Sequence, residues 1–258
     1  MKILLTRPLA QAAVTAKILH DAGIASCGFA VQRMDGQLPP ALHAATTAIF
    51  TDATPIDGLI FISANAVEFG WPWVEHLPQP KLYAVGAATS QALREHAGAQ
   101  AEIVQPPSQF DSEGLLAMPQ LAAVSNQRLV IIRGLGLTPG RDLLASTLRA
   151  RGARVDDAFC YIRTVESPVN RAFAAIEEQL NSGEITMVNV QSGETLSAFE
   201  TLFAPTIELR ANLRLLVPHH RIAGLAVNNG YKCVEVTGVG DNCLKSYLLT
   251  ETSHGKPT

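Results

Sequence analysis

The feature that most constrains the fold is a long internal repeat. Three stretches that each join a strand-like run to a helix-like run have a counterpart elsewhere in the chain. The pairs are KILLTRP (2–8) with RLVIIRG (128–134), GLIFISANAVEF (58–69) with TMVNVQSGETLSAF (186–199), and KLYAVGAATSQALREHAGAQAEIV (81–104) with RLLVPHHRIAGLAVNNGYKCVEV (214–236). A repeat of this length indicates two similar domains within the 258 residues.

Residues 127–167 show the repeating plan most clearly. Leu143, Leu144 and Leu148 lie at helical spacing, and Gly152 is placed to end that helix. The predicted order is a buried strand (129–132), a glycine-rich turn (133–140), a helix (142–151), a second strand (154–159) and a polar exit (160–164). Because strands alternate with helices throughout, we expect an α/β fold of two Rossmann/flavodoxin-like lobes with parallel sheets.

The order of the repeated stretches predicts how the lobes divide the chain. The N-terminal stretch matches one in the middle, whereas the other central stretches match the C-terminal part. The economical solution is a discontinuous lobe 1, residues 1–33 plus 167–258, and an inserted lobe 2, residues 34–166. The two chain crossings, near residues 31–34 and 160–165, are short and extended. We therefore expect them to pair as a two-stranded hinge.

Three further elements are predicted from local pattern. A short helix is expected over residues 41–50, and the helix after Ser63 is expected to end in a Trp71-Pro72-Trp73 loop. That loop is interpreted either as a packing cluster or as a mobile flap. A last helix is expected over residues 241–249, followed by a frayed tail.

Composition narrows the class of protein. Hydrophobic residues make up 47% of the chain and there is no run of about 18 apolar residues and no signal-peptide pattern, so we expect a cytoplasmic protein without a membrane partner. The net charge of -3 argues against broad nucleic-acid binding. The four cysteines share no CxxC spacing and are interpreted as small core or surface residues. A monomer is the default expectation.

Ligands of open parallel sheets bind beyond the carboxyl ends of the strands, where backbone N–H groups of helix N-termini attract anions. The turns predicted there are Thr6-Arg7-Pro8, Ser63-Ala64-Asn65, Gly86-Ala87-Ala88-Thr89, Arg133-Gly134-Leu135, Ser192-Gly193-Glu194 and Pro218-His219-His220. They suit carboxylates or phosphates. If the lobes face each other, both sets converge on one cleft that fits a large polyanion.

Each turn also has a plainer interpretation. Ser63 and Ser192 are good helix N-caps whatever the function, and His219 with its neighbour can be surface histidines, since no carboxylate or cysteine stands at ligand spacing. Gly134-x-Gly136 differs from a dinucleotide fingerprint, because Gly140 comes one position late and Thr138-Pro139 interrupts the turn.

The ordered set of motifs resembles the uroporphyrinogen-III synthase family. It comprises KILLTRP, GLIFISANAVE, YAVGAAT, the RGLG…GRDLL…L.ARGA.V turn and helix, CYIRT, and VQSGE followed by LLVPHHRIAGLA. The resemblance implies a two-lobed α/β lyase of tetrapyrrole biosynthesis that uses no metal or organic cofactor. The family closes linear hydroxymethylbilane, a polycarboxylate tetrapyrrole, with inversion of ring D and loss of water. The resemblance also implies a further partner, hydroxymethylbilane synthase, which would hand the substrate over to this protein.

The resemblance also implies site residues. The family's tyrosine in its Y-x-T stretch falls on Tyr161, which we expect to help the hydroxyl group leave; its alternative role is packing at the hinge. The residues expected to bind substrate carboxylates are Thr6, Arg7, Ser63, Ala64, Gly86, Thr89, Arg133, Gly134, Ser192, Gly193, His219 and Arg221. Pro218-His219-His220-Arg221 departs from the Gly-x-Thr type of turn that many members have, and Pro218 removes one N–H donor.

Two other classes of protein remain compatible with the residues. One is a non-catalytic two-lobed protein that binds a small anion through the same turns. The other is a nucleotide-dependent enzyme on paired Rossmann-like lobes, which the missing glycine fingerprint and acidic residue weaken.

Overall fold

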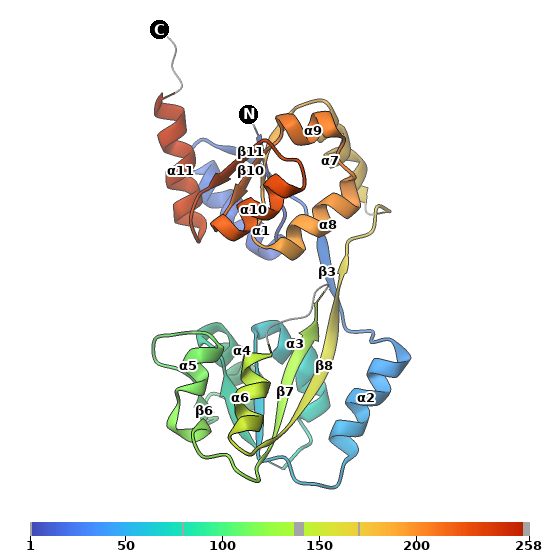
Figure 1. Cartoon of the computed structure of the whole chain (residues 1–258), viewed down its shortest axis with the longest axis vertical. Helices are drawn as coiled ribbons and strands as arrows, with labels where there is room; N and C mark the ends of the chain where they lie inside the picture. The colour runs from blue at the N-terminus through green and yellow to red at the C-terminus, as the bar shows by residue number, and fades with distance from the viewer. Residues whose placement is uncertain (1, 79, 137–141, 170, 255–258) are drawn as a thin grey trace. The chain divides into compact units, whose positions relative to one another are not determined.

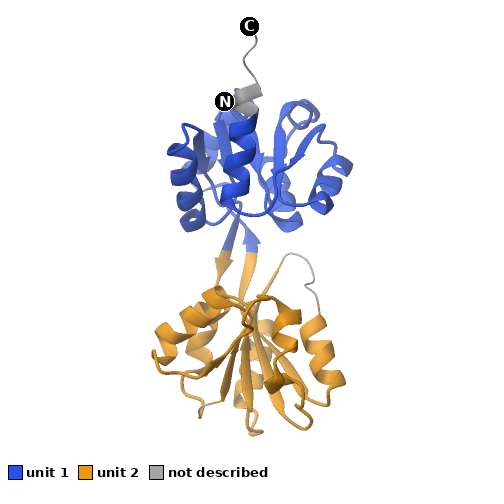
Figure 2. Ribbon diagram, turned by 90° about the vertical axis from the view of Figure 1, so that its left-hand side faces the viewer, with its two compact units in different colours: residues 1–33, 164–258 blue, residues 34–163 orange. Residues whose placement is uncertain are grey.

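The computed structural model describes residues 2–78, 80–136, 142–169 and 171–254 (Figure 1). It divides into two compact units, coloured blue and orange in Figure 2. Unit 1 contains Met1–Arg33 and Thr164–Thr258, and unit 2 contains Met34–Arg163. The discontinuous unit therefore resumes at Thr164, three residues before the position expected from the repeat.

Unit 1 is built on a parallel sheet of five strands in the order β11-β10-β9-β1-β2. The strands are β1 (Lys2–Leu5), β2 (Ala25–Gly28), β9 (Ile185–Asn189), β10 (Arg214–Val217) and β11 (Cys233–Val236). Numbered along this unit alone, the order is 2-1-3-4-5, the flavodoxin arrangement.

Helices cover both faces of the unit 1 sheet because side chains alternate along each strand. Ile3 and Leu5 pack towards α1 (Leu9–His20) and α11 (Asp241–His254). Leu4 packs in a second cluster formed with α7 (Arg171–Asn181), α8 (Gly193–Phe203), α9 (Ile207–Asn212) and α10 (His220–Asn228).

Unit 2 has a six-stranded sheet in the order β3-β8-β7-β4-β5-β6. Its strands are β3 (Gln32–Asp35), β4 (Gly58–Phe61), β5 (Lys81–Ala84), β6 (Ile103–Val104), β7 (Arg128–Leu135) and β8 (Arg154–Val165). Strands β8-β7-β4-β5-β6 occupy the same places as β2-β1-β9-β10-β11 of unit 1. The equivalent strands are those that the repeated sequences matched: β1 with β7, β4 with β9, and β5 and β6 with β10 and β11. The predicted repeat and α/β fold are therefore confirmed.

The two faces of the unit 2 sheet form separate cores. Ile60, Leu129 and Ile131 pack with α5 (Ser112–Leu116), the short helix η1 (Pro119–Leu121) and α6 (Leu143–Ala150). Leu59, Phe61 and Ile132 pack on the other face with α2 (Pro40–Thr51), α3 (Ala64–Val74) and α4 (Ala87–Ala97).

The two chain crossings pair with each other, as the extended pattern predicted. They are β3 and the C-terminal part of β8, which are neighbours in the sheet. Just before β3 begins, the Val31 carbonyl accepts a hydrogen bond from the Glu166 N–H at 2.9 Å. The Arg33 Nε donates to the Thr164 hydroxyl at 3.1 Å. Backbone and side-chain bonds thus join the two crossing segments.

Four predicted boundaries were wrong. Strand β8 continues to Val165, where a polar exit was expected from Cys160, because β8 also pairs with β3. Strand β7 continues through Leu135, where a turn was expected from Arg133, because its pairing with β8 continues past a register shift. Helix α3 contains Trp71–Trp73 rather than ending there, since both tryptophans pack on the core and the Glu75 N–H still bonds to the Trp71 carbonyl at 3.0 Å. Helix α11 continues to His254. Residues 137–140 of the expected turn lie outside the described residues.

The core beneath α3 predicts a sharp difference between two glycines in helices. A methyl group at Gly70 would approach Ile132 Cγ2 to 2.4 Å, whereas one at Gly224 in α10 meets no atom within 4 Å. We expect Gly70→Ala to destabilise unit 2 by about 1–3 kcal/mol through overpacking. We expect the control Gly224→Ala to stabilise its helix by up to about 1 kcal/mol. Guanidinium unfolding of both variants checks this, and equal midpoints would contradict it.

Candidate anion-binding edges of the two sheets

The carboxyl ends of the unit 1 strands form the first candidate site. The Thr6 hydroxyl donates to the Asn189 carbonyl at 2.6 Å, which joins the turns after β1 and β9. The Asn189 side-chain amide donates to the Leu216 carbonyl at 3.2 Å, which joins β9 to β10. The structure therefore brings the predicted turns at Thr6, Ser192 and His219 to one edge.

The equivalent edge of unit 2 contains the turns after β4, β5 and β7. Ser63 and Ala64 open α3, Gly86 is the N-cap of α4, and Arg133 and Gly134 lie near the end of β7. Since β4 pairs with both β5 and β7, these three turns are neighbours along the edge. Each unit therefore carries its own set of the predicted residues.

The helix N-termini at these edges differ in how their N–H groups are used. Ser63 and Ser192 accept hydrogen bonds from Ala66 and Thr195 within their own helices, at 3.0 and 3.1 Å. Helices α1, α4 and α10 have no such side-chain cap and no acidic residue in the first turn. Their N-terminal N–H groups and positive dipole ends are thus left for an anion.

Glu194 distinguishes the start of α8 from the others. It is an acidic residue in the first turn, next to the predicted Gly193. Its own charge occupies the position that favours an anion, so α8 offers a weaker carboxylate site than α1, α4 or α10. A methyl group at Gly193 would lie 3.1 Å from Leu225 of α10, which shows how closely the start of α8 packs on α10.

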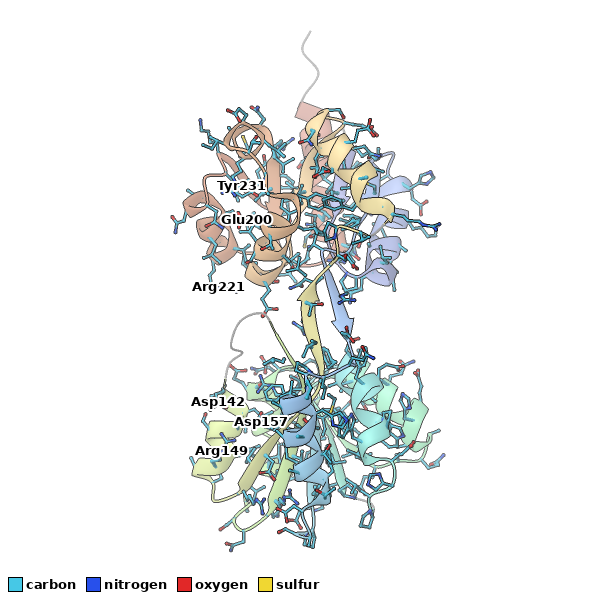
Figure 3. All side chains as sticks on the ribbon, turned by 90° about the vertical axis from the view of Figure 1, so that its right-hand side faces the viewer. Asp142, Arg149, Asp157, Glu200, Arg221 and Tyr231 are labelled. Atoms are coloured by element: carbon cyan, nitrogen blue, oxygen red, sulfur yellow. The ribbon has the colours of Figure 1, made fainter. Side chains whose placement is uncertain are left out.

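The predicted side chains vary widely in exposure. Arg221 is exposed at the start of α10 and has no ion-pair or hydrogen-bond partner within the described residues (labelled in Figure 3). His219 is exposed beside it. Thr89, by contrast, is buried in the first turn of α4.

The two predicted arginines at the ends of β1 and β7 are held in ion pairs. Arg7 Nη1 lies 2.7 Å from the Asp241 carboxylate and 2.9 Å from the Thr15 hydroxyl. Arg133 Nη1 lies 3.2 Å from the Asp157 carboxylate, with the guanidinium 5.7 Å from the centre of the Phe159 ring. Sequence reasoning missed both aspartates. Asp241 is far from Arg7 in the sequence, and Asp157 belongs to no recognisable motif.

Tyr161, the predicted catalytic residue, is packed inside unit 2. Its side chain is 1% exposed and its ring lies 5.1 Å from that of Phe69. Gly134 lies against the ring, since a methyl group there would come within 2.2 Å of it. The absence of a side chain at Gly134 thus provides the space for this tyrosine.

Burial raises the pKa of the neighbouring Cys160 thiol to about 12, which keeps that thiol protonated.

Another turn at the unit 1 edge was not among the predictions. Residues Thr237–Gly240 link β11 to α11, and Gly238 and Gly240 have φ angles of 85° and 93°. The VTGVGDN sequence, with two glycines before an acidic residue, is the signal that could have identified it. This turn delivers Asp241 to Arg7.

A cavity of about 840 Å³ lies elsewhere in unit 2. Its lining includes Trp71, Lys81 and His96, at the C-terminal ends of α3 and α4 and the amino end of β5. It therefore lies away from the edge that carries the predicted turns. Among the described residues, no helix combines the length and apolar character that crossing a bilayer requires.

Comparisons with known proteins agree along almost the whole chain. The family model described as uroporphyrinogen-III synthase HemD matches residues 14–236. The chain belongs to the uroporphyrinogen-III synthase family. The Escherichia coli uroporphyrinogen-III synthase is 31% identical over 255 residues, covering 94% of this chain and 97% of that protein. The Salmonella typhimurium protein of the same name is also 31% identical, with the same coverage.

Solved structures of the family have the same fold. A mutant uroporphyrinogen III synthase from Thermus thermophilus has a TM-score of 0.56 at 18% identity and covers 98% of this chain and 99% of its own. The uroporphyrinogen-III synthetase from Helicobacter pylori has a TM-score of 0.59 at 13% identity, covering 96% and 99%. The family assignment makes the chain an enzyme of tetrapyrrole biosynthesis.

The exposed Arg221 provides a direct test of the unit 1 edge. We expect Arg221→Gln to raise the KM for a polycarboxylate substrate about 2- to 5-fold, because one exposed charge contact is lost. The thermal midpoint should not change, since the side chain has no partner within the described structure. Arg94→Gln, an exposed arginine at the opposite end of a helix in unit 2, is the matched control. Equal KM values for the two variants would remove Arg221 from the site.

Proposed function

We propose that this enzyme closes hydroxymethylbilane to uroporphyrinogen III, with inversion of ring D and loss of water, as a cytoplasmic lyase. The observation that carries the proposal is the likeness to uroporphyrinogen-III synthases over 94% of the chain. We also propose that the enzyme is a monomer and that it receives its substrate from hydroxymethylbilane synthase. The uncapped helix N-termini of both units support a substrate with many carboxylates.

The main task of such an enzyme is orientation. Unaided, the bilane closes through its free terminal position and gives the symmetric type I isomer. To obtain type III, the enzyme must hold the chain so that the substituted carbon of ring D is attacked instead. Carboxylates spaced around the substrate and N–H groups fixed at strand ends provide that constraint without a reacting side chain.

The chemical steps balance as follows. The C–O bond of the hydroxymethyl group breaks as the hydroxyl takes up a proton and leaves as water, which gives an azafulvene cation. Ring D attacks this carbon at its substituted position and forms a spiro-pyrrolenine. The bond between the substituted carbon of ring D and the bridge to ring C then breaks, which leaves an azafulvene cation on ring C. The free α-carbon of ring D bonds to this bridge, closes the macrocycle and loses its proton, which balances the proton taken up by the hydroxyl. The protein must supply a hydrogen-bond donor for the leaving hydroxyl and limit access of water.

An isomer assay tests the function. Hydroxymethylbilane is generated in situ, the protein is added, and the oxidised uroporphyrins are separated by chromatography. We expect type III to replace type I in proportion to the enzyme added. Type I alone, from protein shown to be folded by circular dichroism, would contradict the proposal and leave the anion-binding alternative.

Tyr161 is the proposed donor to the leaving hydroxyl. Since its side chain is buried in unit 2, the phenol must become accessible in the complex with substrate. We expect Tyr161→Phe to lower kcat about 10- to 100-fold, a modest contribution for a general acid, with little change in KM. Tyr83→Phe, at a tyrosine that is equally buried in the same unit, is the control and should retain wild-type kcat. Unchanged turnover in Tyr161→Phe would assign the ring to packing alone.

A further inference from the structure

Arg7 and Arg133 occupy equivalent positions in the two halves of the internal repeat. The matched stretches KILLTRP and RLVIIRG align the two arginines directly. The sheet registers agree with this alignment. In unit 1, Asn189 lies three residues before Ser192 and pairs with Leu5, two residues before Arg7. In unit 2, Ile60 lies three residues before Ser63 and pairs with Ile131, two residues before Arg133.

Both arginines form the same incomplete ion pair. Arg7 uses Nη1 to contact one oxygen of Asp241 at 2.7 Å, and Arg133 uses Nη1 to contact one oxygen of Asp157 at 3.2 Å. In each case Nε is buried and has no hydrogen-bond partner within the described chain. The edge formed by Nε and Nη2, which best matches both oxygens of a carboxylate, therefore makes no salt bridge with the aspartate.

Other arginines of the protein show that full pairing is attainable. Arg214 contacts both oxygens of Glu235 through Nε and Nη2, at 2.9 and 2.8 Å. Arg128 uses Nε on Asp156 at 2.9 Å and its two terminal nitrogens on backbone carbonyls at 2.7 Å. Arg7 and Arg133 are thus the two described arginines that keep a buried, unused Nε, and they are related by the repeat.

Each aspartate has a second partner that would remain if the arginine moved. Asp241 accepts a hydrogen bond from the Thr15 hydroxyl at 3.0 Å. Asp157 lies 3.3 Å from Arg149, and Figure 3 shows both beside Asp142 in unit 2. Loss of the arginine contact would therefore leave neither carboxylate without a donor.

We propose that Asp241 and Asp157 are positioning residues that hold Arg7 and Arg133 in a resting pair, which each arginine exchanges for a bidentate contact with a substrate carboxylate. This inference rests on the proposed polycarboxylate substrate. The exchange turns the guanidinium so that Nε and Nη2 face the ligand. The aspartates then weaken binding but keep the arginines ordered at the strand ends before the substrate arrives.

Lysine and asparagine substitutions separate this role from a purely structural one. Lysine at position 7 retains one charged contact with Asp241 but cannot bind a carboxylate through two nitrogens. We expect Arg7→Lys and Arg7→Gln to raise the KM for hydroxymethylbilane by a similar factor, about 10-fold. We expect Asp241→Asn to lower KM about 2- to 5-fold at unchanged kcat, because the competing charge is gone. Wild-type KM in Arg7→Lys, or a raised KM in Asp241→Asn, would overturn the proposal.

Controls keep stability and catalysis apart from binding. Arg214→Lys, in the bidentate pair of the same unit, should lower the thermal midpoint without changing KM. Arg133→Lys repeats the test in unit 2 if the variants of Arg7 fail to fold. Calorimetric titration with mellitate, a benzene ring with six carboxylates, measures binding without turnover. We expect tighter binding by Asp241→Asn and weaker binding by Arg7→Lys, and equal affinities would contradict the exchange.

The titration also separates the two proposals. If the wild-type protein makes only the type I isomer, the proposed function fails, yet the mellitate affinities still decide whether the aspartates compete with a carboxylate. If type III forms but the affinities of the variants are equal, the function stands and the exchange does not.

Discussion

The structure depends on the parallel pairing of two strands in each unit, β1 with β9 and β7 with β4. In unit 1, with its 2-1-3-4-5 order, and in the matching arrangement β8-β7-β4-β5-β6 of unit 2, this pair is the switch point, where the chain turns away from the sheet in opposite directions. The helices that follow start on either side of it. N–H groups and arginines therefore collect at the carboxyl edge of each sheet, which explains why the turns predicted to bind anions occupy equivalent positions in the two units.

Charge at these edges is balanced rather than simply positive. Arg7 and Arg133 are neutralised by aspartates of their own unit, whereas Arg221 is left exposed. A buried donor without a partner costs about 1–3 kcal/mol, and that cost occurs at both repeat-related arginines. A stable fold does not require it, as the fully paired Arg214 shows. The proposed exchange with a substrate carboxylate would use this unpaired donor in both units.

The sequence predicted the parts of the structure that repeat. Matching strands and capping serines indicated both the α/β fold and the strand pairs, because hydrophobic runs and N-cap residues are local signals. It could not predict that β7 extends to Leu135, since that depends on a partner strand about 25 residues away. Helix α3 passes through Pro72 for a similar reason, as the packing of Trp71 and Trp73 outweighs the local signal to stop.

The candidate site can also be divided into features that local patterns predicted and features that depend on packing between distant segments. The turns at Thr6, Ser63, Gly86, Ser192 and His219 were found from pattern, and the structure places them at the carboxyl edges. The burial of Thr89 and Tyr161 could not be found, because it depends on packing from several elements. Asp241 reaches Arg7 from 234 residues away, a distance at which no local pattern links them.

The most direct test of this account is hydrogen exchange with and without uroporphyrin III, a stable macrocycle with eight carboxylates. The account predicts slower exchange of the amides in the first turns of α1 and α10 in unit 1 and of α4 in unit 2. Protection confined to one unit, or at the amino ends of the strands instead, would contradict the claim that both carboxyl edges bind the substrate.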